Sequence, residues 1–452
     1  MRIPGRFLIA AALLAGIASA PGARPAPEND RLVILVTIDG FPAWLFHDPT
    51  LVIPNLRRLA REGAVADAMT VSNPSITWPN HTTLVTGVSP RRHGVLSNWL
   101  TIPKGPGLPP ATEPWRPKAE LVHAPTVYDA AYRAGLRTAQ VDWVAIQDSG
   151  TIHDEFPEIP KVDGPLEREL VAAGAVDAAG LRDFDKASIV WQDWIWTQAA
   201  IRIVEAHRPN LLLFHLLSTD SSNHQYGPGT LASRSAYAYA DRLLGDLLAA
   251  VDRAGMRERT TVIVTTDHGF KRVDRLVFPN VALREAGLVR VAAGKVVRAD
   301  AFSRAQGGMA FVYITDPARR GELAPRLRSI CAGLEGVARV MDGADGPTLG
   351  MPTPAENPGM GDLVLFAKPG YAFKDKAVGD ATADESRDYL GSHGYAASDP
   401  ELDGFLVAAG RGIRPGARLE RILNLDVAPT LAALLGVPLP GVEGRVLLEI
   451  LR

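Results

Sequence analysis

The chain has 452 residues, enough for one large α/β domain or two moderate ones. Apolar residues make up 46% and charged residues 22%, as in ordinary globular proteins. The formal net charge is −2 and no basic stripe runs along the sequence, which argues against a grip on polynucleotides or on an anionic membrane surface.

The N-terminus has the layout of a secretory signal peptide. Residues 1–6 are basic, and an apolar run from Phe7 to Ala20 ends in small residues. The run is short for a membrane span, so we expect a signal peptide at residues 1–20 and no stable span after its removal; an uncleaved anchor is the alternative. Residues 21–29 are rich in Pro, Gly and Ala and indicate a linker. We therefore expect a periplasmic or secreted protein. With Cys331 as the only cysteine, no internal disulfide can form.

Short, branched apolar runs alternate with helical patterns from residue 31 to residue 269. The predicted strands are Leu32–Ile38, Thr138–Val141, Leu211–Leu217, Val262–Thr266, Asp362–Phe366 and Gly404–Ala408. The predicted helices are Pro54–Glu62, Val127–Ala134, Ser188–Ala206 and Arg234–Ala254, with another that begins at residues 425–431 and is closed by Gly436. This alternation predicts an α/β fold with a mostly parallel sheet sandwiched between helices.

Two stretches interrupt the alternation. Thr101–Pro117 is rich in Pro and Gly, which predicts a surface loop. Residues 271–390 carry shorter strands and helices with Gly/Pro-rich patches, which predicts an inserted small cap subdomain. Residues 30–270 would then be the first part of the sheet domain and residues 391–452 its last part.

Three aspartates follow predicted strands. Asp39 and Asp267 come directly after their strands, and Asp220 follows its strand after two small polar residues. In a parallel α/β sheet, ligands bind outside the carboxyl ends of the strands. A single aspartate in such a place often only caps the next helix, so each acid alone is weak evidence.

Histidines at ligand spacing strengthen the case for a metal site. His224 lies four residues after Asp220, so both face the same way on a helical turn. His268 is adjacent to Asp267, and His393 lies in a glycine-rich frame. The candidate ligands are Asp39, Asp220, His224, Asp267, His268 and His393. Mixed carboxylate and imidazole ligands suit zinc, and this set can hold two ions, which can clamp the attacking and leaving oxygens of a phosphoryl displacement.

Two further histidines, His215 and His81, are expected not to bind metal. His215 lies inside a predicted apolar strand, where a hydrogen-bonded core residue is expected, and His81 is expected to support the site from the helix after Thr77.

Thr77 is the candidate nucleophile. Loop-like residues precede it and Pro79 favours a helix's first turn, so Thr77 lies at or just before a helix N-terminus. An N-cap threonine is the plain alternative. With metal ligands present, the free N–H groups of the helix favour a phosphate, and a zinc ion beside the hydroxyl would make an alkoxide accessible. Asn98 can donate an amide hydrogen bond to a phosphoryl oxygen, although alone it would pass as a turn residue.

Together these segments resemble the alkaline phosphatase superfamily, and within it the nucleotide pyrophosphatase/phosphodiesterase family, also called type I phosphodiesterases. The segments that carry the resemblance are Ile38–Phe41, Thr77–Gly87, His93–Val95, Asp220–Pro228, Thr266–Gly269 and His393–Tyr395. They follow the family's order along most of the chain. Trp78 departs from the Phe that is common at this position in the family.

The resemblance implies an alkaline-phosphatase-like catalytic domain with two zinc ions and a small-molecule phosphodiester or nucleotide as substrate. One zinc would be held by Asp220, His224 and His393, and the other by Asp39, Thr77, Asp267 and His268. Thr77 would form a phospho-threonine intermediate that is then hydrolysed, and Asn98 would donate to a phosphate oxygen.

Three rival functions remain open at this point. A phosphate monoesterase of the same superfamily would add cationic side chains, for which Arg91, Arg92 and Lys118 are candidates. A sulfatase would need a Cys or Ser in a C/S-x-P-x-R setting, which Cys331 lacks. A non-catalytic exported binding protein would be expected to have lost ligands. The sequence holds no signal for the oligomeric state.

Overall fold

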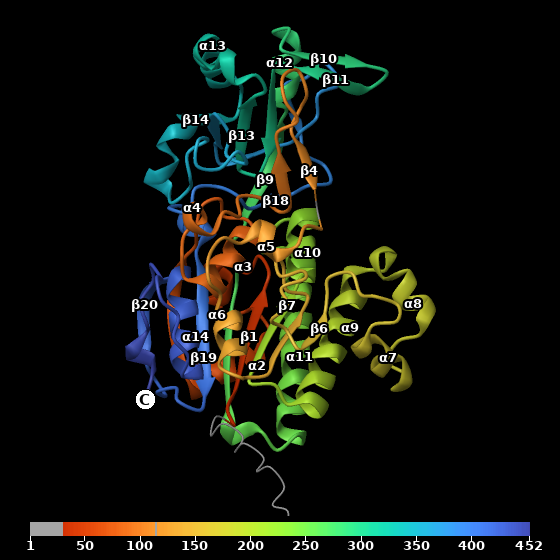
Figure 1. Cartoon of the computed structure of the whole chain (residues 1–452), viewed down its shortest axis with the longest axis vertical. Helices are drawn as coiled ribbons and strands as arrows, with labels where there is room; N and C mark the ends of the chain where they lie inside the picture. Colours follow the sequence, from red (N-terminus) through yellow and green to blue (C-terminus); the bar gives the residue numbers. More distant parts are fainter. Residues whose placement is uncertain (1–29, 114) are drawn as a thin grey trace, which may run out of the picture.

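The computed structural model describes residues 30–113 and 115–452, so the signal and linker segments expected at 1–20 and 21–29 lie outside the described residues. A large sheet with helices on both faces forms one end of the molecule, and smaller sheets from the middle of the chain form the other end (Figure 1).

The main sheet has eight strands in the order β20-β2-β19-β8-β1-β7-β5-β6. They are β1 (Leu32–Ile38), β2 (Ala64–Thr70), β5 (Thr138–Val141), β6 (Asp154–Phe156), β7 (Leu211–Leu216), β8 (Thr260–Thr265), β19 (Gly404–Gly410) and β20 (Arg418–Leu423). Every neighbouring pair is parallel except those of β19, which runs antiparallel to β2 and to β8. The predicted mostly parallel sheet is confirmed.

Helices cover both faces of this sheet. One face packs against α2 (Pro54–Glu62), α9 (Ile189–Arg202) and α11 (Leu231–Arg253), and the other against α3 (Thr77–Thr86), α6 (Val127–Arg133) and α14 (Val427–Leu435). Along β1, Ile34 and Val36 pack into the first core, whereas Val33 and Leu35 pack into the second. Side chains alternate between the faces of a strand, so a strand with helices on both sides is apolar throughout, which is why its sequence was readable as a buried strand.

Shorter helices complete this part of the chain. They are α1 (Ala43–Phe46), α4 (Pro90–His93), α5 (Lys118–Leu121), α7 (Pro165–Ala172), α8 (Ala178–Arg182) and α10 (Ser218–Tyr226). The predicted helix Ser188–Ala206 is observed as α9 followed by a π-helical turn at Ile203–His207.

The region predicted to be an inserted cap, residues 271–390, contains two smaller sheets and a hairpin. One sheet has β9 (Lys271–Val277), β16 (Gly370–Phe373) and β17 (Ala383–Glu385), and β18 (Gly391–Ser392), just beyond this region, also pairs with β9. The other sheet has β12 (Ala301–Ala305), β13 (Met309–Ile314), β14 (Val337–Asp342) and β15 (Leu363–Ala367). The hairpin is β10 (Val289–Ala292) and β11 (Lys295–Ala299), and the helices are α12 (Pro279–Glu285) and α13 (Arg320–Ala332). A separate core that includes Leu327, Cys331 and Leu365 holds this region together.

One loop prediction was wrong. The stretch Thr101–Pro117 contains most of a two-stranded antiparallel sheet, β3 (Leu100–Ile102) and β4 (Ala111–Glu113). Its Pro and Gly residues lie mainly in the connection, and such residues mark a turn without revealing the short strands beside it. In the described part of the chain, no helix is both long and apolar enough to cross a membrane.

Candidate active site

Three adjacent strands bring the predicted acids together. Asp39 directly follows β1, Asp267 lies just beyond β8, and Asp220 is in the first turn of α10 after β7. Because β8, β1 and β7 are neighbours in the sheet and run parallel, their carboxyl ends meet at one edge. All three carboxylates are buried there.

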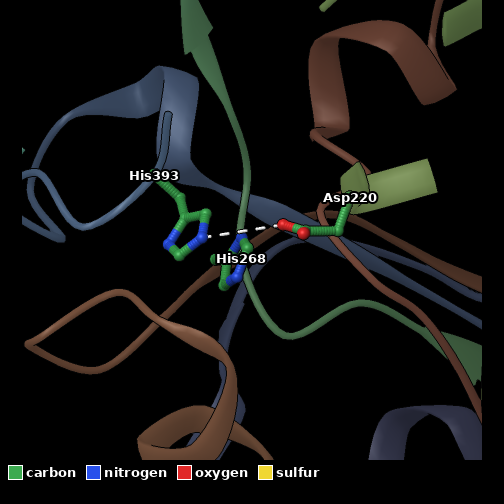
Figure 2. A group of neighbouring side chains, drawn as sticks. All are labelled: Asp220, His268 and His393. Carbon is green, nitrogen blue, oxygen red and sulfur yellow. Dashed lines mark ion pairs between the residues drawn. The ribbon is translucent and has the colours of Figure 1, made fainter. Parts of the chain in front are cut away.

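Two buried groups of ligand atoms result. Asp220, His268 and His393 form one, and Asp39, Asp267 and His268 form the other, with the ligand atoms of each group within 4.8 Å of one another. Figure 2 shows His393 and Asp220 turned toward each other, with Nε2 and Oδ1 3.6 Å apart, and His268 beside them. Since His268 is common to both groups, the two candidate sites are adjacent, and the structure brings together the residues that the sequence singled out.

His224 joins the first group from α10. Its Nε2 lies 3.5 Å from Asp220 Oδ1 and 3.2 Å from His393 Nε2. The separation of four residues between Asp220 and His224 thus places both side chains on the same side of α10, as expected for a helix.

Backbone carbonyls orient the three imidazoles. In each ring Nδ1 donates to a carbonyl oxygen. His224 donates to Gly391 O (2.9 Å), His268 to Gly269 O (3.1 Å) and His393 to Ser75 O (3.3 Å). A proton on Nδ1 leaves the Nε2 lone pair directed at the carboxylates, which is the tautomer that a metal ligand needs. Burial lowers the pKa of both His224 and His393, which favours the neutral form of each ring.

The site contains buried polar atoms that lack hydrogen-bond partners. They are Asp39 Oδ1, Asp220 Oδ1, Asp267 Oδ2 and His268 Nε2. Burial raises the pKa of Asp39 well above its usual range, and the charges of Asp267 and Asp220 raise it further. Uncompensated, each such buried charge costs several kcal/mol, so this arrangement fits divalent cations between the acids and imidazoles. The mixed nitrogen and oxygen donors suit zinc.

Thr77 is the first residue of α3, and Ile76 is the N-cap. The prediction that Thr77 lies at a helix N-terminus is confirmed, whereas the alternative that its side chain caps the helix is not, because the capping position belongs to Ile76. The next turn holds it in place: His81 Nδ1 donates to Thr77 O (3.0 Å). His81 Nε2 lies 2.9 Å from Thr37 Oγ1, and Nδ1 also lies 3.6 Å from Asp267 Oδ2, so His81 supports the site from directly beside one of the candidate ligands.

Asn98 meets the first turn of the same helix. Its Oδ1 accepts from the backbone N–H of Trp78 at 2.9 Å. This bond fixes the amide so that Nδ2 is its free donor, which is the group a phosphoryl oxygen at the helix terminus would need.

A buried chain of hydrogen bonds behind Asp39 was only partly foreseen. His215 Nε2 donates to Asp39 Oδ2 at 2.9 Å, and its Nδ1 lies 3.0 Å from Asp142 O and 3.1 Å from Asp142 Oδ2. His215 is therefore the hydrogen-bonded core residue that its sequence context predicts. The role of Asp142 was missed, although it directly follows the predicted strand Thr138–Val141, the same signal that marked Asp39. Burial raises the pKa of Asp142 to about 7.

Two cavities flank the site. One of about 380 Å³ is lined by aromatic rings that include Trp78, Trp115 and Trp143. The other, of about 510 Å³, is lined by residues that include Asn98 and His393. Because Trp78 is adjacent to Thr77 and Asn98 bonds its N–H, both cavities open beside the candidate nucleophile.

The cations proposed for a monoesterase are engaged elsewhere. Arg91 pairs with Glu356 at 2.7 Å, Arg92 lies 3.7 Å from Glu443, and Lys118 pairs with Asp129. These arginines and this lysine therefore do not form a free basic clamp for a doubly charged phosphoryl group.

Comparison with known proteins identifies relatives of both the sequence and the fold. Ectonucleotide pyrophosphatase/phosphodiesterase family member 1 from Homo sapiens is 23% identical over 279 residues, which is 61% of this chain but 27% of that protein. Family member 7 from Homo sapiens is 28% identical over 302 residues, 63% of this chain and 59% of the relative. The matched part thus spans between about a quarter and three fifths of these relatives.

Solved structures of ectonucleotide pyrophosphatase/phosphodiesterase 5 share the fold. The murine protein has a TM-score of 0.70 at 17% identity and covers 93% of this chain and 100% of its own; the human protein has a TM-score of 0.69 at 18% identity, with 92% and 97% covered. The family described as type I phosphodiesterase/nucleotide pyrophosphatase matches residues 33–396, which contain every predicted site residue. The chain belongs to the type I phosphodiesterase/nucleotide pyrophosphatase family.

Proposed function

We propose that this chain is an exported two-zinc hydrolase that cleaves phosphodiester or pyrophosphate bonds in nucleotide-type substrates through a phospho-threonine intermediate on Thr77. The observation that carries the proposal is the meeting of a buried carboxylate and imidazole cluster with a helix N-terminus that bears a hydroxyl. That combination offers a nucleophile, a phosphate site and a means of charge compensation in one place.

The ligands divide between two ions in this proposal. Asp220, His224 and His393 would hold one, and Asp39, Asp267, His268 and the Thr77 hydroxyl would hold the other. When bound, the ions supply positive charge that lowers the pKa of the hydroxyl and neutralises the buried acids. The sharing of His268 between both geometric groups fits two ions that lie close together.

The protein's own groups position the reaction. Thr77 Oγ1 forms a bond to phosphorus while the bond from phosphorus to the leaving oxygen breaks, and water then cleaves the phospho-threonine and restores the hydroxyl. Asn98 Nδ2 donates to a non-bridging oxygen, and the free N–H groups of α3 favour the anion. The tryptophan-lined cavity beside Trp78 suits an aromatic group of the substrate.

A structural relative supports this substrate class. The proposal of export rests on the sequence alone. One structural neighbour, an inactive threonine-to-alanine variant of murine ectonucleotide pyrophosphatase/phosphodiesterase 5, is described in complex with AMP, at a TM-score of 0.68 and 18% identity. The basic and apolar pattern at residues 1–20 supports passage to the periplasm or outside the cell. Cell fractionation, with N-terminal sequencing of the mature protein, tests this part.

Paired chromogenic substrates test the reaction. The purified protein is assayed on an aryl phosphodiester and the matching monoester, with and without a chelator, while its metal content is measured. We expect the diester to be cleaved faster, activity to vanish with the chelator and to return with zinc, and about two ions to be bound per chain. A monoester preference of tenfold or more, about 1.4 kcal/mol of transition-state binding, would instead establish the phosphatase alternative.

A further inference from the structure

We propose that Lys374 binds a second anionic group of the substrate and so makes the enzyme favour substrates with a charged arm over diesters whose arms are neutral. The inference rests on the proposed function and deepens it by assigning a specificity residue. Lys374 lies in the cap-like region, residues 271–390, which contains none of the site residues predicted from the sequence.

Lys374 shares a cavity with the candidate phosphate-binding groups. It directly follows β16, in the cap-like region, and lines the cavity of about 510 Å³ together with Asn98, His393, Trp99 and Arg304. A substrate whose phosphorus lies beside Asn98 and His393 can therefore extend one arm past the Lys374 ammonium within the same cavity.

An aromatic ring holds the lysine beside the ligand cluster. Lys374 Nζ lies 3.2 Å from the centroid of the Tyr389 ring, and that ring stacks on His224 at 4.7 Å with an interplanar angle of 20°. The hydroxyl of Tyr389 lies 3.0 Å from Ser392 Oγ, next to His393, which fixes the ring's position. The cation–π contact places the ammonium without neutralising its charge.

No carboxylate of the described residues lies within ion-pair distance of the ammonium, although the charges of Asp375 and Asp388 act on it. Its neighbour Asp375 is committed elsewhere, since Oδ2 accepts from Arg304 at 2.9 Å and Oδ1 from the backbone N–H of Ala305 at 2.6 Å. Among the described residues, Lys374 takes part in no ion pair, whereas the buried Lys271 pairs with both Asp399 (2.5 Å) and Glu401 (2.6 Å). Lys374 is partly buried, so its ammonium keeps donors that a ligand in the cavity can use.

The surroundings favour an anion that arrives with the substrate. Burial lowers the pKa of Lys374, which is the cost of holding an unpaired ammonium in this cavity. The Tyr389 ring that Lys374 contacts stacks on His224, so the ammonium lies close to the ligand cluster. A carboxylate or a phosphate group would satisfy it equally, because lysine binds either as a point charge.

Substrates that differ only in the non-leaving arm test the proposal on the zinc-loaded enzyme. The set is 4-nitrophenyl phenyl phosphate, its analogues with a carboxylate or a phosphonate on the phenyl ring, and 4-nitrophenyl phosphate. We expect Lys374→Met to lower kcat/KM about tenfold on the charged diesters, mainly through KM, and by less than about twofold on the neutral diester. The two charged arms distinguish a carboxylate from a phosphate-type group.

Two further variants serve as controls. Lys376→Met removes a nearby lysine that lies 4.6 Å over the Phe278 ring and does not line the cavity, and it should change nothing. Lys374→Arg should restore most of the selectivity, and melting temperatures should show that all variants fold.

The results that would overturn the proposal are distinct. Equal losses on all three diesters would show a structural role, no loss on any would remove Lys374 from recognition, and a selective loss on the monoester would place the ammonium against the transferred phosphoryl group. If the wild-type enzyme cleaves no diester at all, the proposed function fails and this inference falls with it; normal diester activity without the charge effect rejects only the role of Lys374.

Discussion

The carboxyl edge of the main sheet and the cap-like region at residues 271–390 handle charge in opposite ways. At the sheet edge, acids and imidazoles converge in a largely buried cluster in which they lie against one another. In the cap-like region, charged groups such as Arg304 and Asp375 lie nearer the surface and pair with each other, while Lys374 forms no ion pair within the described residues.

The difference separates placement of the chemistry from choice of substrate. Backbone topology alone brings Asp39, Asp220 and Asp267 together, because they follow three adjacent parallel strands. Lys374 reaches the same site from a separately packed region, through one aromatic contact with Tyr389. Changes to the ligand cluster at the sheet edge should abolish turnover, whereas changes to Lys374 should alter which substrates are preferred.

The largest effect should come from Thr77→Ala. Loss of the nucleophile should lower turnover by a thousandfold or more, about 4 kcal/mol, while the melting temperature changes little because Ile76 holds the N-cap position. Thr77→Ser should keep part of the activity, since its hydroxyl can take the same place. Turnover and thermal unfolding are measured on one preparation, and an active alanine variant would overturn the assignment.

Leu327→Ala tests whether the cap-like region is packed separately. This fully buried leucine of α13 lies in the separate core, and its truncation should destabilise that region by about 3 kcal/mol. Hydrogen exchange of α13 should speed up while kcat/KM on the neutral diester stays within about twofold. Leu244→Ala, in the core beneath the main sheet, is the matched control and should affect the whole catalytic unit. Equal loss of neutral-diester activity in both variants would contradict the separation.

His215→Gln tests whether the hydrogen bonds behind Asp39 contribute to metal binding. The variant loses the bridge between Asp39 and Asp142, so zinc affinity should fall by about tenfold to a hundredfold, as for other groups that orient metal ligands. Zinc titrations followed by activity should show much of the turnover restored at saturating metal. Unchanged zinc affinity would mean that the bridge is only part of the core packing.

A partly exposed histidine between two acids, outside the candidate site, gives the baseline for ordinary charges. Burial opposes protonation of His207, but hydrogen bonds and charges from Glu169 and Asp154 raise its pKa, with contacts of 3.0 and 2.7 Å. The stabilisation is therefore fully present below the unfolded pKa of about 6.5 and is lost as the pH rises through the higher folded value. His207→Gln should cost at most about 1 kcal/mol at pH 5.5 and less at pH 9. Denaturant unfolding at both pH values checks this, and a larger loss at pH 9 would contradict it.

The sequence predicted those parts of the fold in which a local pattern has one structural meaning. The short, branched run Leu32–Ile38, apolar except at Thr37, favours a buried strand, and β1 has those bounds. The separation of four residues between Asp220 and His224 predicts that their side chains lie together once a helix is assumed. Lys374 and Tyr389 offer no such pattern, because their meeting depends on how the cap-like region packs on the sheet edge. The hairpin β3–β4 was hidden for a different reason, since three-residue strands are too short to show alternation.

The antiparallel strand β19 has a consequence for how the protein is made. It fills the gap between β2 and β8 and arrives only after the whole cap-like region has been translated. At ordinary synthesis rates that delay is on the order of ten seconds, during which β8 presents an open edge to other chains and β2, whose neighbours are β19 and β20, has no partner in the sheet. The nascent protein therefore needs protection from aggregation until residue 410 emerges.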